Sequence, residues 1–479
     1  MAVTDVPTGA EIPVAGRWQT TAERLTVRSP YDGSIVAEVS KASPVDIEAA
    51  VAAAHAAFAR TRRIPAYERS RILAEVSHSI AVEREHLART LTLETGKPIR
   101  DARVEVDRAT LTFAIAAEEA KRVGAEMIPM DWAASGENRV AVNRRFPIGV
   151  VLGIAPFNYP LNLVAHKVAP AIASGNPIVV KPASQTPTSA LQLARFAIDA
   201  GWPAEALAVV PSESGQFEPF VTDERVKKIT FTGSAAVGWR LKELGWRKKV
   251  TLELGGNAGV IVHDDADLEF AAARVAAGGF GFSGQSCISV QRVYVQRSVE
   301  ERFTELVLAK ARALRTGDPL DEATDIGPMI APDAVDRYEA WLDEAIGGGA
   351  KALLRGERAG NAVGPTVLVD ADPAMNVCAK EVFAPLINIF PYDDFGDAVA
   401  RVDESIYGLQ AGVFTRDIVR IWQAYEGIEV GGLMVNEVPS WRIDHMPYGG
   451  VKESGWGREG LRYAIEEMTE PRLLVIQLR

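Results

Sequence analysis

The chain has 479 residues, more than one hydrophobic core usually organises, so we expect two large lobes and a smaller appendage. Its composition, 47% hydrophobic and 24% charged, is that of a globular protein and excludes a disordered chain. The net charge of −11 argues against a general nucleic-acid or anionic-membrane surface. Two cysteines are too few for a disulfide framework, and no Cys/His cluster suggests zinc, so we expect no metal.

The N-terminal segment carries Asp5 and Glu11 and shows no secretory signal. The longest apolar run, residues 148–165, is interrupted by two prolines and an asparagine and is a poor membrane span. We therefore expect a cytoplasmic protein.

Helical patterns come first along the chain. Ser43 is a good N-cap, Pro44 suits the first helical position, and Asp46 has the capping-box spacing, which predicts a helix over 43–62. Long helical patterns follow at 66–96 and 98–123.

From about residue 139, buried β-branched runs alternate with helical segments, which is typical of a parallel α/β sheet. The segment to Gly256 predicts a doubly wound, nucleotide-binding type of core. A second α/β series follows, so a domain boundary is expected near 253–256. The last residues, 472–479, read as a strand without a following partner, and we expect it to pair with another subunit.

A glycine-rich stretch, GGFGFSGQSC (278–287), matches the dinucleotide fingerprint G-x-G-x-x-G at Gly279, Gly281 and Gly284. That fingerprint requires a strand before it and a helix after it, whereas here a helix precedes and a strand follows. The glycines are better interpreted as a sharp bend around Cys287.

Cys287 has two interpretations from its residues alone. A lone cysteine is usually a small buried hydrophobe. Against this, a polar turn precedes it, whose backbone N–H groups could steady an anion and raise the thiolate fraction. Cys378 has no such setting and is interpreted as structural.

Seven motifs occur in a characteristic order. They are PFNYPLN (156–162), KPAS (181–184), FTGS (231–234), LELGG (252–256), GQSC (284–287), EVFAPL (381–386) and PYGGVKESGWGREG (447–460). Together they closely resemble the aldehyde dehydrogenase superfamily over nearly the whole chain. The chain looks nearest to the branch acting on lactaldehyde, succinate semialdehyde, non-phosphorylating glyceraldehyde 3-phosphate and phosphonoacetaldehyde.

The resemblance implies an α/β fold with a Rossmann-like cofactor domain, a catalytic domain and a small β oligomerisation arm. It places the dinucleotide-binding domain at 1–128 and 148–252 and the catalytic domain at 253–462. The arm takes 129–147 and 463–479, and implies a homodimer or homotetramer.

The resemblance also implies the catalytic residues. Cys287 would attack the aldehyde, Asn158 would stabilise the oxyanion, and Glu253 would activate water to hydrolyse the thioester. A carboxylate at an apolar strand end is expected to have a raised pKa. The alternatives are a turn role for Asn158 and a satisfied buried carboxylate for Glu253.

NADP or NAD is the implied cofactor. Serine at 184 replaces the glutamate with which many NAD-using relatives repel a 2′-phosphate, so NADP is accommodated and dual use is expected. A solvated surface lysine is the alternative for Lys181. The implied cofactor-binding residues are Lys181, Ser184, Gly233, Ser234, Glu381, Phe383, Ile154 and Pro156.

The substrate is expected to be a small anionic or hydroxylated aldehyde, contacted by Arg108, Arg442 and His445, each of which could instead be a surface or packing residue. We expect no nucleic-acid or membrane partner. Two rival functions stay open: a cysteine-dependent thiol hydrolase or acyltransferase, and a non-catalytic protein of the same fold.

Overall fold

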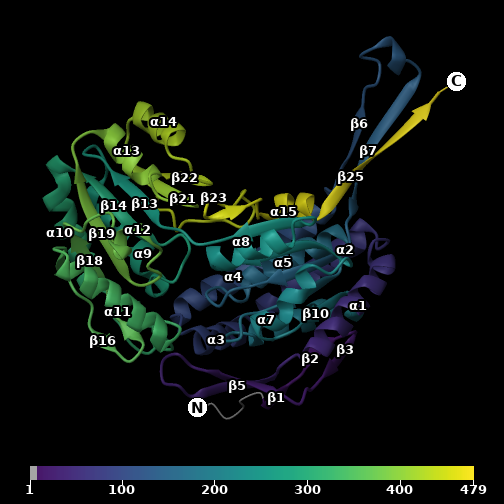
Figure 1. Cartoon of the computed structure of the whole chain (residues 1–479), viewed down its shortest axis with the longest axis horizontal. Helices are drawn as coiled ribbons and strands as arrows, with labels where there is room; N and C mark the ends of the chain where they lie inside the picture. The colour runs from purple at the N-terminus through teal and green to yellow at the C-terminus, as the bar shows by residue number, and fades with distance from the viewer. Residues whose placement is uncertain (1–7, 479) are drawn as a thin grey trace.

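The computed structural model describes residues 8–478, which form two α/β lobes and a projecting arm (Figure 1). The first lobe is built on a six-stranded sheet of order β10-β9-β8-β11-β12-β24, parallel except at the edge pair β12-β24. Its strands are β8 (Val150–Ile154), β9 (Ile178–Lys181), β10 (Leu207–Val209), β11 (Val226–Thr232), β12 (Lys249–Glu253) and β24 (Gly455–Trp456). The predicted α/β class with parallel-type sheets is confirmed.

The second lobe contains a seven-stranded sheet of order β15-β18-β19-β14-β13-β21-β22, in which only β15-β18 is antiparallel. Its strands are β13 (Ala258–Val262), β14 (Val290–Gln296), β15 (Lys351–Leu354), β18 (Thr366–Val369), β19 (Leu386–Tyr392), β21 (Gln410–Phe414) and β22 (Gly432–Val435). Separate apolar clusters lie on the two faces of this sheet, so it is doubly wound. The continuous apolar runs of the central strands follow from this two-sided burial.

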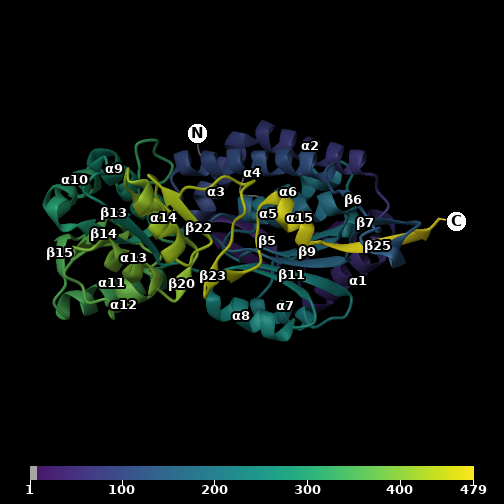
Figure 2. The ribbon, with the colours of Figure 1, turned by 90° about the horizontal axis from the view of Figure 1, so that it is seen from above.

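Helices cover both faces of each large sheet (Figure 2). Those of the first lobe are α1 (Pro44–Thr61), α2 (Ala66–Val82), α3 (Arg84–Thr95), α4 (Ile99–Ala120), α5 (Asn162–Ser174), α6 (Thr188–Asp199), α7 (Ser214–Phe217), α8 (Ala235–Leu244) and α15 (Leu461–Glu467). Those of the second lobe are α9 (Leu268–Phe280), α10 (Glu300–Arg312), α11 (Pro332–Gly347), α12 (Asn376–Ala379), α13 (Phe395–Asp403) and α14 (Ile418–Gly427). No helix within 8–478 is long and apolar enough to cross a membrane.

Two details of the predicted helices can be compared with the structure. The capping box at the start of α1 is confirmed. The Ser43 side chain accepts from the Asp46 N–H, and the Asp46 side chain accepts from the Ser43 N–H. The helical pattern over 66–96 is not one helix but two, since the backbone of Glu83 leaves the helical region between α2 and α3. Neither proline nor glycine marks this break, so periodicity alone did not show it.

The arm is a three-stranded antiparallel sheet of order β25-β7-β6 that projects from the first lobe (Figure 1). Its strands are β6 (Ala125–Ile128), β7 (Arg139–Pro147) and β25 (Thr469–Gln477). The terminal strand does have a partner within the chain, contrary to expectation, because β25 pairs with β7 along its whole length, whereas its pairing with another subunit stays a prediction. Nevertheless, Leu473, Leu474, Val475 and Ile476 are exposed.

The C-terminal segment returns to the first lobe after the seven-stranded sheet is complete. β24 adds to the edge of β12, and Leu461, Ile465 and Met468 join the core of the first lobe. Short strands complete the chain: β1 (Thr8–Ala10), β2 (Ile12–Val14), β3 (Arg17–Gln19), β4 (Arg24–Arg28), β5 (Ile35–Ser40), β16 (Arg358–Ala359), β17 (Ala362–Val363), β20 (Tyr407–Gly408) and β23 (Val451–Lys452). The predicted domain boundaries stay a prediction.

Candidate active site

A cavity of about 810 Å³ is lined by both lobes. Segments far apart in the sequence contribute its walls: α4, the loop after β8, the end of β12, the loop before Cys287, and the loop around Arg442 and Tyr448. The carboxyl ends of parallel strands lie on this side, which is where open α/β sheets place their ligand sites.

The loop before Cys287 bends through three consecutive left-handed residues: Phe282 (φ 48°), Ser283 (φ 56°) and Gly284 (φ 68°). Two of these are not glycine, which indicates backbone strain held in place by the surrounding structure. A Cβ at Gly284 would lie 2.1 Å from the carbonyl oxygen of Ala384, so only glycine fits there. Helix α9 precedes this bend and strand β14 follows it, so the fingerprint is rightly rejected and the bend interpretation is confirmed.

Cys287 lies in the cavity wall with its Sγ 3.3 Å from the Tyr448 hydroxyl. Burial raises the pKa of the Cys287 thiol to about 11, against the hydrogen bond from Tyr448, which lowers it. This direction is opposite to the expected rise in thiolate fraction, because loss of hydration outweighs the Tyr448 hydrogen bond and the charge of Arg442.

Asn158 extends from the loop after β8 toward the Cys287 loop. Its side-chain amide donates to the carbonyl oxygen of Gln285 at 3.0 Å, which uses one of its two N–H groups. The backbone N–H of Cys287 has no hydrogen-bond partner within residues 8–478. These two N–H groups border the same cavity and can donate to an oxyanion formed beside the sulfur.

Glu253 ends β12 and is 3% exposed, and neither of its carboxylate oxygens has a partner within 8–478. Burial raises its pKa well above the ordinary value, and the charge of Glu459 raises it further. The expected direction of this shift agrees with the structure. The following glycines allow close packing, since a Cβ at Gly256 would lie 2.2 Å from the Cys287 carbonyl oxygen.

A buried charge network lies beside Glu253. Lys167 donates to Glu459 at 3.3 Å, and the Arg442 guanidinium donates to the other oxygen of Glu459 at 3.4 Å. Burial opposes ionisation of Glu459, but these cations hold its pKa below the usual range. Glu459 therefore stays charged and favours the protonated form of Glu253.

The predicted substrate residues lie in different places. Arg108 lines the cavity and makes a two-point ion pair with Asp444, with Nε···Oδ2 of 3.1 Å and Nη2···Oδ1 of 2.7 Å. Arg442 also lines the cavity and lies on the Tyr448 ring, 3.5 Å from its centroid. His445 is exposed and does not line the cavity, so its expected substrate contact is corrected: its neighbour Asp444 turns inward instead.

The predicted cofactor residues gather at the carboxyl edge of the first sheet. Ile154 and Lys181 are register partners at the ends of β8 and β9, with Pro156 and Ser184 just beyond. Lys181 is buried, and within 8–478 the only hydrogen bond of its ammonium group is a 3.4 Å contact to the carbonyl of Pro182. Burial lowers its pKa to about 8. A buried ammonium group with so few partners fits the hydroxyl groups of a ribose.

Gly233 and Ser234 line the cavity at the N-terminus of α8, whose first turn receives no side-chain cap. Free N–H groups at the start of a helix suit a pyrophosphate. On the opposite wall, Glu381 accepts from the Gly256 N–H at 2.9 Å, and burial raises its pKa to about 7. Phe383 has φ of 54° and packs edge-on against Phe157. These residues fit a dinucleotide.

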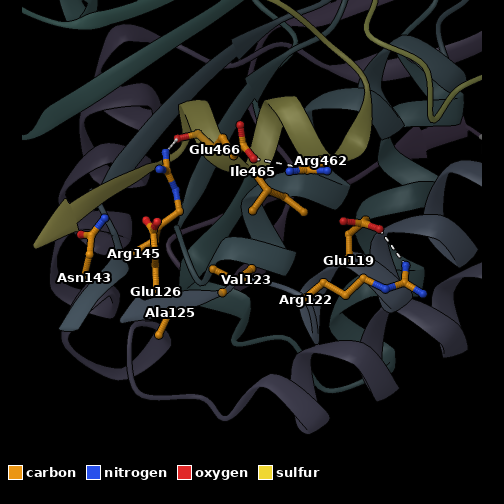
Figure 3. A pocket seen from close by; sticks show the side chains of 11 residues that line it. Glu119, Arg122, Val123, Ala125, Glu126, Asn143, Arg145, Arg462, Ile465 and Glu466 are labelled. Atoms are coloured by element: carbon orange, nitrogen blue, oxygen red, sulfur yellow. Dashed lines mark hydrogen bonds and ion pairs between the residues drawn. The ribbon is translucent and has the colours of Figure 1, made fainter. Parts of the chain in front are cut away.

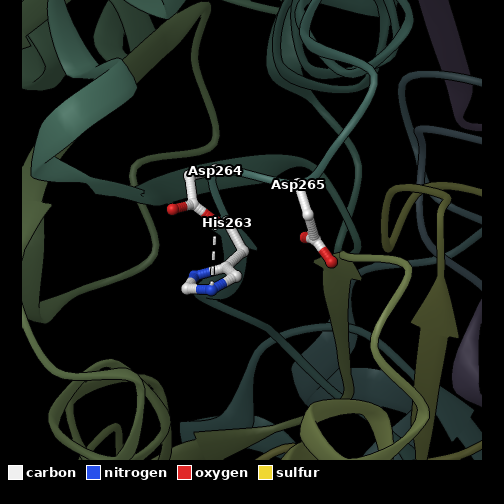
Figure 4. A group of neighbouring side chains, drawn as sticks. All are labelled: His263, Asp264 and Asp265. Atoms are coloured by element: carbon white, nitrogen blue, oxygen red, sulfur yellow. Dashed lines mark ion pairs between the residues drawn. The ribbon is translucent and has the colours of Figure 1, made fainter.

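Two other groups of titratable side chains lie outside this cavity. A second cavity, of about 480 Å³ at the base of the arm, is lined by two ion pairs, Glu119 with Arg122 and Glu466 with Arg462, among other residues (Figure 3). A cluster of His263, Asp264 and Asp265 follows β13 (Figure 4). His263 Nδ1 lies 2.7 Å from the Tyr392 hydroxyl, and Thr415 donates to Asp265 Oδ2, whereas Oδ1 of Asp265 has no partner within 8–478. Neither place includes a cysteine.

Sequence reasoning missed Tyr448 and Glu459 as site residues, although both lie within the quoted segment 447–460. The position of Tyr448 between a proline and two glycines was the available signal. Its contact with Cys287, 161 positions away, follows only from the packing of the two lobes.

Comparisons with known proteins find similar sequences and structures over nearly the whole chain. A protein-family model described as "Aldehyde dehydrogenase family" matches residues 18–474. The chain is 45% identical over 466 residues to the 3-sulfolactaldehyde dehydrogenase of Priestia aryabhattai, covering 97% of each. The structure of aldehyde dehydrogenase 21 from Physcomitrella patens, in complex with the reaction product succinate, is 41% identical, with a TM-score of 0.97 and 99% of both chains covered. Glyceraldehyde-3-phosphate dehydrogenase GapN from Methanocaldococcus jannaschii, complexed with NADP, is 36% identical, with a TM-score of 0.92, covering 95% of this chain and 100% of that one.

Proposed function

The chain belongs to the aldehyde dehydrogenase family and oxidises aldehydes with NAD(P), and from this premise we propose that it converts a small anionic aldehyde to its carboxylic acid through a thioester on Cys287. One observation carries this proposal: Cys287, Asn158 and Glu253 all line the same cavity. Arg108 and Arg442 line it too.

Cys287 acts as the nucleophile. Because burial raises the pKa of its thiol to about 11, a base must remove the thiol proton when the aldehyde binds. Glu253 lines the same cavity, and when it is ionised its carboxylate oxygens are free to accept that proton. Sulfur then bonds to the carbonyl carbon, the carbonyl π pair moves to oxygen, and Glu253 receives the thiol proton. The Cys287 N–H and the second N–H of Asn158 donate to the oxyanion.

The predicted cofactor residues would hold NAD(P) at the carboxyl edge of the first sheet. A bound nicotinamide would supply the hydride acceptor, and loss of hydride from the carbon held on Cys287 would leave a thioester there. Lys181 and Ser184 would hold the adenine-side ribose, the start of α8 the pyrophosphate, and Glu381 the second ribose. The serine at 184 leaves space for a 2′-phosphate without charge repulsion, which supports use of NADP as well as NAD.

Glu253 passes the thiol proton to solvent after the first step and, ionised again, completes the reaction as a general base. It takes a proton from a water molecule while the water oxygen bonds to the thioester carbon; the C–S bond then breaks and the acid leaves. Its raised pKa suits this role because a base that titrates nearer neutrality is both available and basic enough.

The proposed substrate is an aldehyde bearing a carboxylate or sulfonate. Asp444 accepts hydrogen bonds from Nε and Nη2 of Arg108. Nη1 of Arg108 has no partner within 8–478, and the Arg108 side chain borders the cavity. The name of the 45% identical relative, 3-sulfolactaldehyde dehydrogenase, also supports an anionic three-carbon substrate.

The test is cofactor reduction at 340 nm with sulfolactaldehyde, succinate semialdehyde, lactaldehyde and neutral butyraldehyde. Cys287→Ala should abolish reduction, and Arg108→Leu should raise KM for the anionic aldehydes at least tenfold more than for butyraldehyde. Arg297→Leu removes an exposed arginine paired with Asp393 and serves as the control. Equal effects of Arg108→Leu on anionic and neutral substrates would exclude the anionic specificity.

A homodimer or homotetramer is also proposed. The arm projects from the body, β25 pairs on one side only, and four consecutive apolar residues of that strand are exposed. The mass of the native protein in solution should be a multiple of the chain mass, and that of a chain ending at residue 468 should fall toward one chain. A native protein of one chain mass at micromolar concentration would contradict this.

A further inference from the structure

We propose that the Tyr448 hydroxyl is a catalytic hydrogen-bond donor to the sulfur of Cys287, and that Arg442 positions the Tyr448 ring for this contact. The inference rests on the proposed role of Cys287 as nucleophile. It adds a residue that the sequence motifs did not identify, and it assigns the buried arginine a role other than substrate binding.

The contact is direct and the ring is held in place from several sides. The Tyr448 oxygen lies 3.3 Å from Cys287 Sγ. The backbone of Tyr448 exchanges two hydrogen bonds with that of Glu459, and its ring packs with Ile288 and Leu409. Tyr448 is 3% exposed, so the hydroxyl has little access to water as an alternative partner.

The direction of the hydrogen bond follows from the chemistry of sulfur. A neutral thiol can donate or accept, but a thiolate has no proton and can only accept. Burial raises the pKa of Tyr448 well above its usual range, so the phenol keeps its proton whenever Cys287 ionises. The hydroxyl is therefore a donor to the thiolate, and donors to charged acceptors form the stronger hydrogen bonds.

Arg442 acts on this donor through the ring. Its guanidinium carbon lies 3.5 Å from the ring centroid, close enough for a cation–π contact. Glu459 holds the guanidinium by an Nη2···Oε2 contact of 3.4 Å, and Asp444 lies 3.8 Å from Nε. The positive charge of Arg442 on the ring face makes the Tyr448 hydroxyl a better hydrogen-bond donor. The same charge also lowers the pKa of the Cys287 thiol.

The experiment measures alkylation of Cys287 in the free enzyme by iodoacetamide, in which the thiolate forms an S–C bond and iodide leaves. The second-order rate is followed by mass spectrometry as a function of pH for the native protein and Tyr448→Phe. Titratable and charged groups facing Cys287 in both proteins are Glu253, Glu381, Arg442 and Tyr159. Since the substitution leaves all of these in place, a difference between the two profiles reports the hydroxyl.

Tyr448→Phe should raise the midpoint of the alkylation profile by about one pH unit and slow alkylation at pH 8 about tenfold. It should lower kcat more than it changes KM, because the hydroxyl contacts the reacting sulfur. Tyr392→Phe is the matched control: it removes another buried hydroxyl, whose partner is His263 Nδ1 at 2.7 Å, and should leave the profile unchanged.

A Tyr448→Phe profile that coincides with the native one would overturn the inference, as would an equal shift in Tyr392→Phe. Failure of the proposed function would be seen differently. If native enzyme alkylated at Cys287 kept its dehydrogenase activity, Cys287 would not be the nucleophile, whatever the profile of the variant.

Discussion

Replacing Glu253 by glutamine tests the assignment of this residue as the base that hydrolyses the thioester. The side chain keeps its size, and because it is 3% exposed with no partner for either oxygen, the change breaks no hydrogen bond within 8–478. General bases contribute roughly 10²- to 10⁴-fold, so kcat should fall by that factor, equivalent to about 3 to 5 kcal/mol in the barrier.

The assay is stopped-flow absorbance at 340 nm with saturating aldehyde and cofactor. Because Glu253 is proposed as the base in both steps, the variant should release the first equivalent of reduced cofactor more slowly than native enzyme and then turn over slowly, with the acyl group found on Cys287 by mass spectrometry where hydrolysis is the slower step. In the native enzyme, kcat should rise with pH through the raised pKa of Glu253, because only the ionised carboxylate accepts a proton.

Glu94→Gln provides the matched control, since Glu94 is another fully buried carboxyl and does not line the cavity. Its kcat should equal that of the native enzyme. A Glu253→Gln variant with steady-state turnover within about threefold of native would refute the reasoning, because roughly 10²-fold is the least that loss of a general base should cost.

Three further predictions concern other parts of the site and the fold. Asn158→Ala should lower kcat roughly 10²- to 10³-fold with little change in KM, measured at steady state; a loss below about tenfold would exclude an oxyanion role. Ser184→Glu should lower kcat/KM for NADP at least tenfold while preserving that for NAD, because a carboxylate repels a 2′-phosphate. Equal losses with both cofactors would show that Ser184 does not face the 2′ position of the ribose. Burial raises the pKa of Glu94 from 4.5 to about 8. The protonated carboxyl of Glu94 therefore stabilises the folded protein fully below pH 4.5, and this contribution is lost as the pH rises toward 8, roughly 4 to 5 kcal/mol in total. Across this range Tm should fall less in Glu94→Gln than in the native protein. Parallel Tm curves for the two proteins would contradict the raised pKa.

Several features of the protein can be determined from local sequence alone, because local chemistry dictates them. The capping box at Ser43 and Asp46 depends on residues three apart, and the buried strands of both sheets depend on runs of β-branched residues bounded by turns. The order of helix, bend and strand around Cys287 was also readable, since glycines and the change of period mark it. The family followed from seven short motifs taken together.

Other features depend on contacts between segments far apart in the chain, which no local pattern encodes. The pKa of Cys287 is raised by burial between two lobes, so the dipoles of its own turn could not predict it. Arg108 is held by Asp444, 336 positions away, whereas His445 beside that aspartate faces outward. Terminal strand β25 finds its partner in β7, more than 300 positions earlier in the chain, and only tertiary structure brings Tyr448 to the sulfur of Cys287. Burial and electrostatics depend on everything that packs around a group, and for that reason the sequence could predict which residues react, while only the fold decided their charge, partners and surroundings.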